Sequence, residues 1–351
     1  MIFIDSLTVT QAFEAGTLPI LGEEHHQIVE VVSGEIKAQF GSGLWSEGSY
    51  STKLRITSDG TTLKVSGNPS RFGREDNLYG YTDVRECIRV YNRVLESLWL
   101  PSFTFETVHQ TQFHSNTGAL VKTHTHDLGC KITRIDLTQN FRVGPENVLP
   151  FLRSISGNTI RGQAGFLYAN GLTTDWFRGS QRLYVKYYAK AQHYKKMLKN
   201  PTKYQLELAE WMEKQGIIRF EVSLKSKKLT ELELNEVGSW STETMKRILE
   251  SYYTHNTFNT DPFGDIAAQI KKYKPEASDN ECERAEQIVA AWMTGYDCRK
   301  LPKTTYYRYR AMIKLVGLDI ASPCRKDNIT TMIRTIDVEP LEIPQFYKHV
   351  A

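Results

Sequence analysis

Two stretches, KITRIDLTQNF at residues 131–141 and IIRFEVSLK at residues 217–225, decide the fold. In both, apolar and polar side chains alternate over most of the length, which is the period of a β-strand rather than of a helix. The segments GFLYANG (165–171) and QRLYVKYY (181–188), which lie between them, have the same character. Helical patterns separate these strands. The sequence therefore predicts an α+β fold, in which a mixed or antiparallel, palm-like sheet is flanked by helices.

The chain before these strands continues the β pattern. Short alternating runs separated by glycines occupy residues 1–66, and an amphipathic helix is expected over residues 82–98, before Pro101. We therefore expect residues 1–100 to form an N-terminal β region with a helix, packed against a catalytic core at residues 101–235.

Helical patterns replace the strand pattern in the last third of the chain. Residues 236–351 are expected to form a mainly helical module, with a polar, proline-containing linker near residues 273–280. Within about 281–318, two amphipathic helices are joined by a short turn, which is the outline of a helix-turn-helix.

The second of these helices begins with residues suited to DNA. Thr304, Arg308 and Arg310 could meet phosphates and base edges in a major groove. The alternative is an ordinary pair of packed helices, held together by apolar residues such as Trp292 and Ile313.

Composition excludes several classes of protein. The chain has a net charge of +4, with 40% hydrophobic and 24% charged residues, which is ordinary globular usage. The sequence contains neither an apolar run of membrane-spanning length nor a Walker A string. The sequence thus indicates a cytoplasmic protein with no membrane partner and no helicase motor of its own.

Two strands carry an arginine and an acid two residues apart. Arg134 and Asp136 share one face of a strand, as do Arg219 and Glu221, because side chains alternate with a period of two. If the strands are neighbours, the two carboxylates meet and require a divalent cation or the arginines to neutralise them. The alternative is a set of structural ion pairs.

A third strand carries tyrosines between lysines. Tyr184, Lys186, Tyr188 and Lys190 are expected on one face, where the ammonium groups would lower the pKa of the Tyr188 phenol. Such a phenol suits nucleophilic catalysis. The alternative is a packing role, and a one-residue shift of register would exchange Tyr188 for Tyr187.

The order RID, Tyr-x-Lys and RFE resembles the filamentous-phage gene II/X replication proteins and, more distantly, the Rep_trans plasmid initiators. The resemblance extends to SGNPSRFGREDNLYGY at residues 66–81 and to LPKTTYYRYRAMIKLVGLDI at residues 301–320, with MIRTIDVEP at 332–340. Together these segments span most of the chain.

This resemblance implies a rolling-circle replication initiator. Such an enzyme nicks one strand of a double-strand origin, keeps the 5′ phosphate on a tyrosine, leaves a 3′ hydroxyl as primer and later rejoins the strand. The resemblance implies origin DNA, a host helicase and a host DNA polymerase as partners, and a homo-oligomer on DNA is possible within it.

Carried over by motif, Tyr188 corresponds to the nucleophile, and Asp136 and Glu221 to ligands of Mg²⁺ or Mn²⁺. Lys190 would hold the developing charge of the phosphate. We also expect DNA contacts from the remaining basic residues of the three strands, which are Arg134, Lys186 and Arg219.

Two other functions stay open at this point. His124 and His126 imitate the His-x-His metal motif of HUH nucleases, although threonine stands between them and the sequence favours a surface hairpin with incidental histidines. A non-catalytic, sequence-specific DNA-binding regulator would keep the sheet and the helix-turn-helix without needing the acids and the tyrosine to converge.

Overall fold

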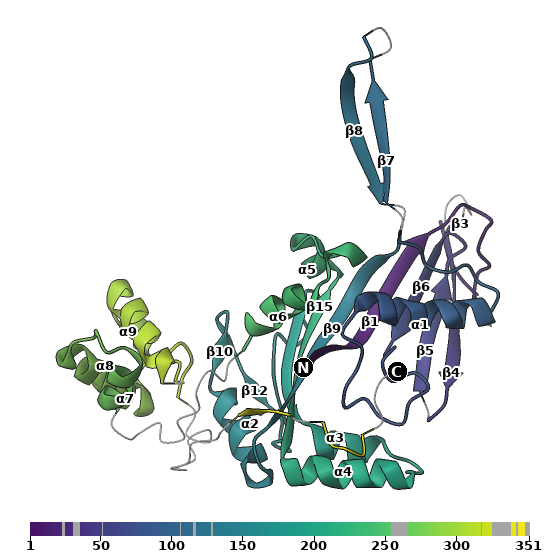
Figure 1. The fold of residues 1–351 in the computed structure, drawn as a ribbon. Helices are drawn as coiled ribbons and strands as arrows, with labels where there is room; N and C mark the ends of the chain where they lie inside the picture. Colours follow the sequence, from purple (N-terminus) through teal and green to yellow (C-terminus); the bar gives the residue numbers. More distant parts are fainter. Residues whose placement is uncertain are drawn as a thin grey trace.

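The computed structural model shows an α+β protein (Figure 1). It describes most of the chain, namely residues 1–22, 25–30, 36–50, 52–105, 107–114, 117–127, 129–253, 266–316, 318–324, 338–341 and 343–347. Most of the MIRTIDVEP segment, residues 332–337, lies outside these ranges.

One long antiparallel sheet forms the centre of the molecule (Figure 1). Its strands are hydrogen-bonded in the order β12-β13-β14-β15-β9-β1-β6-β5-β4, and β16 pairs with β9. The strands are β1 (Ile2–Ala12), β4 (Leu44–Gly48), β5 (Thr52–Ser58), β6 (Thr62–Gly67), β9 (Lys131–Arg142), β12 (Phe166–Leu167), β13 (Thr173–Trp176), β14 (Leu183–Ala189), β15 (Ile217–Lys225) and β16 (Glu339–Pro340). The predicted antiparallel sheet is confirmed, and β13 is a strand that the sequence pattern did not predict.

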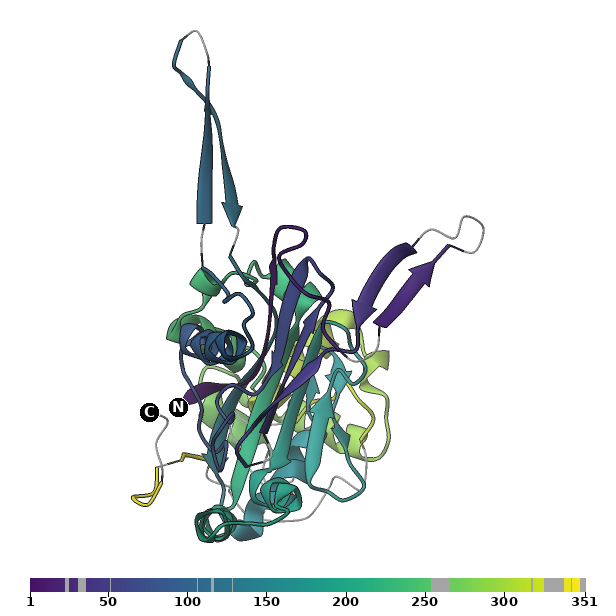
Figure 2. The ribbon, with the colours of Figure 1, turned by 90° about the vertical axis from the view of Figure 1, so that its right-hand side faces the viewer.

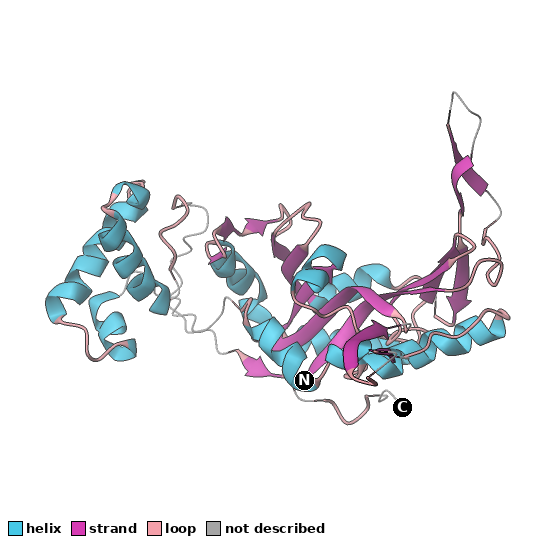
Figure 3. Cartoon of the chain, turned by 90° about the horizontal axis from the view of Figure 1, so that it is seen from above, coloured by secondary structure: helices cyan, strands magenta, loops and turns pink. Residues whose placement is uncertain are grey.

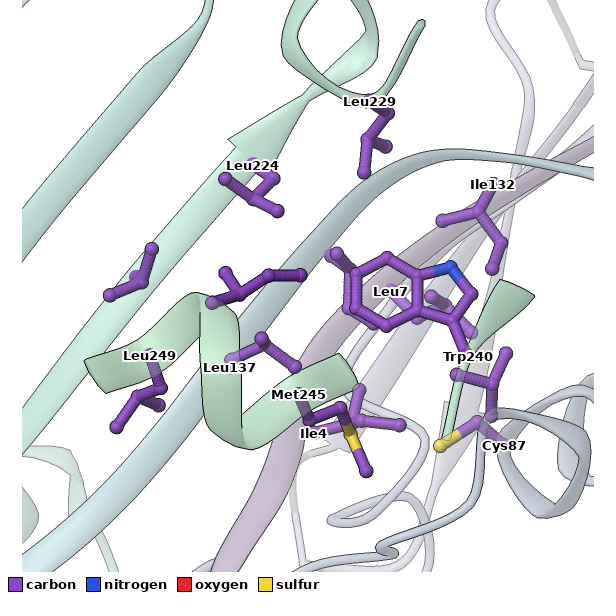
Figure 4. Packing of buried hydrophobic residues seen from close by; sticks show 14 of the residues in the cluster. Ile4, Leu7, Cys87, Ile132, Leu137, Leu224, Leu229, Trp240, Met245 and Leu249 are labelled. Carbon is purple, nitrogen blue, oxygen red and sulfur yellow. The ribbon is translucent and has the colours of Figure 1, made fainter. Parts of the chain in front are cut away.

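Helices cover one face of this sheet. They are α1 (Val84–Ser97), α2 (Val148–Ser156), α5 (Ser226–Glu231) and α6 (Thr242–Glu250). The side chains that alternate toward this face form the main core; in β5, for example, Leu54 and Ile56 are buried while Lys53 and Arg55 are exposed. Figure 4 shows Leu137 and Leu224 of the sheet packed against Met245 and other helix residues.

A second layer closes one end of the opposite face. It consists of α3 (Lys190–Met197), α4 (Lys203–Gln215) and the loop at residues 68–81. Tyr79, Tyr194 and Leu208 form its core with Phe3 of β1, and Thr202 caps α4 through a capping box. The SGNPSRFGREDNLYGY segment of the resemblance is therefore the loop that reaches over this end of the sheet.

Two hairpins project from the body (Figures 1 and 2). One pairs β2 (His25–Val29) with β3 (Ile36–Gly41), the other pairs β7 (Thr107–Phe113) with β8 (Leu120–Asp127). Both are two-stranded sheets separate from the central one, and a further small hairpin joins β10 (Thr159–Ile160) to β11 (Gln163–Ala164).

The C-terminal helices form a module with their own core (Figure 3). The module contains α7 (Ile266–Tyr273), α8 (Asp279–Met293) and α9 (Lys303–Leu315). Short 3₁₀ turns lie at η1 (Pro145–Asn147), η2 (Val237–Ser239) and η3 (Cys298–Lys300). In the described part of the chain, no helix is long and apolar enough to cross a membrane.

The central sheet and its core extend across the boundaries expected at residues 100 and 235. Strand β1 lies between β6 and β9 in the central sheet, and one core runs from Ile4 to Tyr252. Residues 1–100 and α6 therefore pack in the same core as residues 101–235. The reason is that strand pairing joins segments far apart in sequence, which local patterns do not report.

Candidate active site

The three motif strands β9, β15 and β14 are adjacent in the sheet. Glu221 lies opposite Thr138 on one side and Lys186 on the other, and Arg219 lies opposite Asn140 and Tyr188. Residues in such register point to the same side of a sheet. That side faces away from α1 and α6, and we call it the polar face; it carries Arg134, Asp136, Arg219, Glu221, Lys186 and Tyr188.

The two candidate metal-binding carboxylates are close on the polar face. Asp136 lies opposite Ser223 and Glu221 opposite Thr138, so the acids are diagonal neighbours at about 7–8 Å. Both are almost fully buried, with 3% and 4% of their surfaces exposed. The two strands are neighbours, and the two carboxylates therefore lie close together, as the sequence predicted for that case.

Each of these carboxylates is held by a cation. Arg134 donates to both oxygens of Asp136, at 3.0 and 2.8 Å, and the Lys186 ammonium lies 2.8 Å from Oε1 of Glu221. Burial raises the pKa of Glu221 above its usual value; Lys186 opposes this shift, and the carboxylates of Asp5 and Asp136 add to it. Glu221 is therefore a stronger proton acceptor than an exposed carboxylate.

Tyr188 faces this pair of acids. Its hydroxyl donates to Oε2 of Glu221 at 3.5 Å, and the Lys186 ammonium lies 5.0 Å from its ring centroid. Burial raises the pKa of Tyr188 well above its usual value, although Arg219 acts in the opposite direction. The expectation of a lowered pKa is wrong, because desolvation of the phenolate outweighs the neighbouring positive charges.

Lys190 is not on the strand. Strand β14 ends at Ala189, and Lys190 is the first residue of α3, where it is 1% exposed. Its ammonium donates to Oδ1 of Asn77 at 2.7 Å, and burial, followed by repulsion from Arg219, lowers its pKa well below the usual value. Lys190 thus ties the loop at residues 68–81 to the start of α3.

Arg219 is fully buried beneath the same loop. It donates to Oδ1 of Asn140 at 2.8 Å and to the Leu78 carbonyl at 2.9 Å, and it lies 3.4 Å from the Asp5 carboxylate. A guanidinium is tolerated at 0% exposure only with such partners. The proposed direct contact of Arg219 with DNA does not fit this burial, whereas Lys186 and Arg134 are 26% and 46% exposed.

Sequence reasoning missed Asp5. This residue lies at a β-bulge of β1, where its Oδ1 accepts hydrogen bonds from Asn68 and Asn77, each at 3.0 Å. Burial alone would raise its pKa, but Arg219 and Lys190 hold the pKa below its usual value. The available signal was an aspartate inside the otherwise apolar strand IFIDSL, where aspartate is uncommon.

The oxygen atoms around Asp136 and Glu221 are of the kind that a hard divalent cation binds. Next to the two acids, the hydroxyls of Thr138 and Ser223 are buried and have no hydrogen-bond partner among the described residues. Mg²⁺ needs only one or two carboxylates and keeps several waters, which unsatisfied hydroxyls could bind. In the described residues no three acidic, histidine or cysteine side chains form a closed metal cage.

The rival nucleophile Tyr187 points to the other side of the sheet. It is 0% exposed and stacks on Phe220 with ring centroids 4.3 Å apart. Its ring belongs to the main core beneath the helices. The observed register therefore leaves Tyr188 as the tyrosine beside the acids.

Comparisons with known proteins agree over most of the chain. The family of the phage replication-associated gene II protein matches through its N-terminal region at residues 4–243 and through its C-terminal region at residues 280–351. The chain belongs to this replication-associated gene II protein family. This confirms the resemblance stated above and supports the predicted role in initiating rolling-circle replication.

Two curated members of the gene II family are similar over nearly their full length. The replication-associated gene II protein of Escherichia phage If1 is 27% identical over 84% of this chain and 97% of its own. That of Enterobacteria phage I2-2 is 25% identical over 86% of this chain and 85% of its own. A rolling circle replication initiator from Geobacillus stearothermophilus covers 72% of this chain and 84% of its own, with 14% identity and a TM-score of 0.32, which is too low to carry an argument.

In this gene II family chain, His124 and His126 lie on β8 of a projecting hairpin. That hairpin is separate from the sheet that carries Asp136 and Glu221 (Figure 1). The side chains of both histidines lie outside the described part of the chain. The backbone of this segment forms a surface hairpin, which was one of the two interpretations of the sequence; the other was a metal site.

The C-terminal region of the gene II family contains the helix-turn-helix candidates on α9. Thr304 and Arg308 are exposed near the start of the helix, and Arg308 pairs with Glu281 of α8. Arg310 instead donates to both oxygens of the buried Asp319, at 2.7 and 3.0 Å, and to Thr159 of β10 at 3.1 Å. The predicted DNA contact of Arg310 therefore competes with a structural ion pair.

Arg310→Ala is expected to destabilise the protein, because among the described residues it leaves Lys314 as the remaining ion-pair partner of the Asp319 carboxylate. Loss of hydrogen bonds to a charged group costs about 1.5–3 kcal/mol of unfolding free energy. Urea unfolding of this variant, beside Arg308→Ala as the exposed counterpart, measures the difference. Equal midpoints for both variants would contradict the structural role of Arg310.

Proposed function

We propose that this chain is a site-specific DNA nickase that opens one strand of a phage origin to start rolling-circle replication. The observation that carries the proposal is the placement of Tyr188, Glu221 and Asp136 together on the polar face. A regulator that only binds DNA has no need of a phenol hydrogen-bonded to a buried carboxylate.

In the proposed reaction, the Tyr188 hydroxyl oxygen attacks the phosphorus of the scissile bond. Glu221 accepts the phenol proton through Oε2, the oxygen to which the Tyr188 hydroxyl donates. The bond between phosphorus and the 3′ oxygen breaks, and that oxygen takes up a proton and becomes the primer. Because one phosphodiester replaces another, the reverse reaction can rejoin the strand without a further energy source.

The cations around Tyr188 divide into two groups in this proposal. Lys186 and Arg134 reach solvent and contact the scissile and neighbouring phosphates. Arg219 and Lys190 are buried, where they position the loop at residues 68–81, and Arg219 also favours the phenolate of Tyr188. We therefore assign the charge of the reacting phosphate to Lys186 rather than to Lys190.

A divalent cation is part of the proposal. Mg²⁺ or Mn²⁺ would polarise the scissile phosphate, and Asp136 and Glu221 are the residues that would hold it. The unpartnered hydroxyls of Thr138 and Ser223 among the described residues support a hydrated ion at this place. Approach of DNA phosphates would draw Arg134 and Lys186 away from the acids and so open the carboxylates to the ion.

The test of this function is incubation with supercoiled origin DNA of the phage and Mg²⁺, followed by peptide mapping of covalent adducts. We expect open circular DNA and a single DNA-linked peptide that contains Tyr188. Origin binding without any nick would favour the regulator. A nick that requires the β7–β8 hairpin histidines would favour the HUH reaction.

We assign origin recognition to the exposed start of α9. Arg308→Ala is expected to weaken binding of double-stranded origin DNA and to reduce the slope of log affinity against log salt by about 1. Nicking of a short single-stranded site should remain, since Arg308 lies on the C-terminal module. Fluorescence anisotropy over a salt series measures this slope. If the slope of Arg308→Ala equals that of the wild type, α9 packs against α8 without contacting DNA.

The remaining partners follow from the reaction. A host helicase would unwind the nicked duplex, and a host DNA polymerase would extend the 3′ hydroxyl. Both enzymes and the phage DNA are available in the bacterial cytoplasm. The relatives from two phages support a phage setting. A homo-oligomer on DNA stays a prediction.

A further inference from the structure

The polar face continues past the active site onto the N-terminal strands. Ser66 of β6 lies opposite Thr8 of β1, and Thr8 lies opposite Arg134 of β9. On the outer side, Arg55 of β5 pairs with Ser66, and Trp45 of β4 pairs with Arg55. A single row of in-register side chains thus runs from the edge of the sheet to the arginine that holds Asp136.

We infer that this row binds a single strand of DNA that extends away from the nick, with Trp45 stacking on a base and Arg55 contacting a phosphate. The row is defined by Trp45, Arg55, Ser66, Thr8 and Arg134, and we call it the N-terminal track. The inference rests on the proposed nicking function, because that function brings single-stranded DNA to Arg134.

The outer end of the track is open to solvent. Trp45 is 60% exposed, although a tryptophan ring is among the most apolar surfaces a protein carries. The covering helix α1 packs on the other side of the sheet (Figure 2), where its Tyr91 donates to the carbonyl oxygen of Leu7 of β1. An exposed aromatic at the edge of a sheet is a stacking platform for unpaired bases, which duplex DNA does not offer.

The charges of the track suit phosphates. The Arg55 guanidinium lies 5.9 Å from the Trp45 ring centroid and donates to the Ser42 carbonyl. In the part of the chain that the structure describes, neither Arg55 nor its diagonal neighbour Lys64 forms an ion pair, so both charges are available. Glu47 is already neutralised by Lys53.

The dimensions also agree with a short strand of DNA. From β4 to β9 the track crosses four strand spacings of about 4.8 Å, or about 19 Å in total. OB folds, which bind single strands on a small β-barrel, hold roughly 4–16 nucleotides. Base stacking and phosphate contacts of this kind tolerate many sequences, so the track would strengthen binding without reading the origin.

The test is fluorescence anisotropy with labelled oligothymidylate of about 20 nucleotides, using Tyr188→Phe protein so that no cleavage intervenes. Trp45→Ala is expected to weaken binding roughly 5- to 150-fold, which corresponds to about 1–3 kcal/mol of stacking per base. Arg55→Ala should reduce the salt slope by about 0.7, the value for one phosphate contact on a single strand.

Matched controls lie on the other side of the sheet. Trp99 is 95% exposed directly after α1, and Arg89 is an exposed arginine of that helix. Trp99→Ala and Arg89→Ala should leave binding unchanged. Photocrosslinking with bromodeoxyuridine in the same oligonucleotide should label the peptide that contains Trp45.

Unchanged affinity in Trp45→Ala and Arg55→Ala, or crosslinks only to other peptides, would overturn the track while leaving nicking by the wild-type protein untouched. Conversely, intact track binding by a wild-type protein that never nicks origin DNA would overturn the proposed function alone. The two failures are therefore distinguishable.

Discussion

Tyr188→Phe is expected to abolish the covalent protein–DNA adduct. The substitution removes only the hydroxyl oxygen that attacks the phosphate, while the ring stays in the place that Tyr188 occupies on the polar face. Removal of a nucleophile that acts with its neighbours as a unit lowers the rate by a factor on the order of 10⁴–10⁶. Denaturing gel electrophoresis of protein mixed with labelled single-stranded origin DNA measures the adduct.

Tyr187→Phe is the matched control for this experiment. The two tyrosines are consecutive, yet Tyr187 lies in the core against Phe220. We expect the Tyr187 variant to form the adduct at close to the wild-type rate. If the adduct survives in Tyr188→Phe and disappears in Tyr187→Phe, the register of β14 on DNA differs from the one observed here.

The second large effect is expected for the acids. Asp136→Asn and Glu221→Gln keep the shape of each side chain but remove its negative charge, and with it cation binding and proton transfer from Tyr188. Loss of a general base alone costs about 10²–10⁴ in rate. We expect nicking of supercoiled origin DNA to be lost, while anisotropy shows origin binding within a few-fold of wild type, since these residues do not read bases.

Mn²⁺ binding provides a readout that does not depend on activity. Electron paramagnetic resonance of free Mn²⁺ should show an ion held by the wild-type protein with single-stranded DNA and released by either variant. Glu243→Gln, which changes an exposed carboxylate in the first turn of α6, should behave as wild type in the nicking assay and in the Mn²⁺ assay. Loss of DNA binding in both acid variants would assign Asp136 and Glu221 to DNA contact or folding instead of metal binding.

The reactive state of Tyr188 is set by its surroundings rather than by its sequence neighbours. Lysines two residues away on each side suggested a lowered pKa, whereas the structure buries the phenol and raises the pKa. Only one of those lysines shares the strand with Tyr188, because Lys190 begins α3. Desolvation depends on every segment that packs around a group, and no local pattern reports it.

The spacing of apolar and polar residues was sufficient to predict most of the individual strands and helices. The strands β9 and β15 and the helices α1, α4, α8 and α9 are confirmed, because the spacing of apolar and polar side chains follows the period of each element. In β15 residues on both sides are buried, so the alternation there separates the apolar core from the buried polar face. The same alternation placed Asp136 with Arg134, and Glu221 with Arg219, on common strand faces. The motif order also indicated the replication-associated family.

The tertiary structure alone decided how these segments meet. It brought Asp5 of β1 and Asn77 of the loop at residues 68–81 to the site, buried Arg219 beneath that loop, and committed Arg310 to Asp319. It also extended the polar face of β9 through β1 to Trp45. Strand neighbours and ion-pair partners are chosen by packing between distant segments, so a sequence read locally predicts which face a residue occupies but not what lies opposite it.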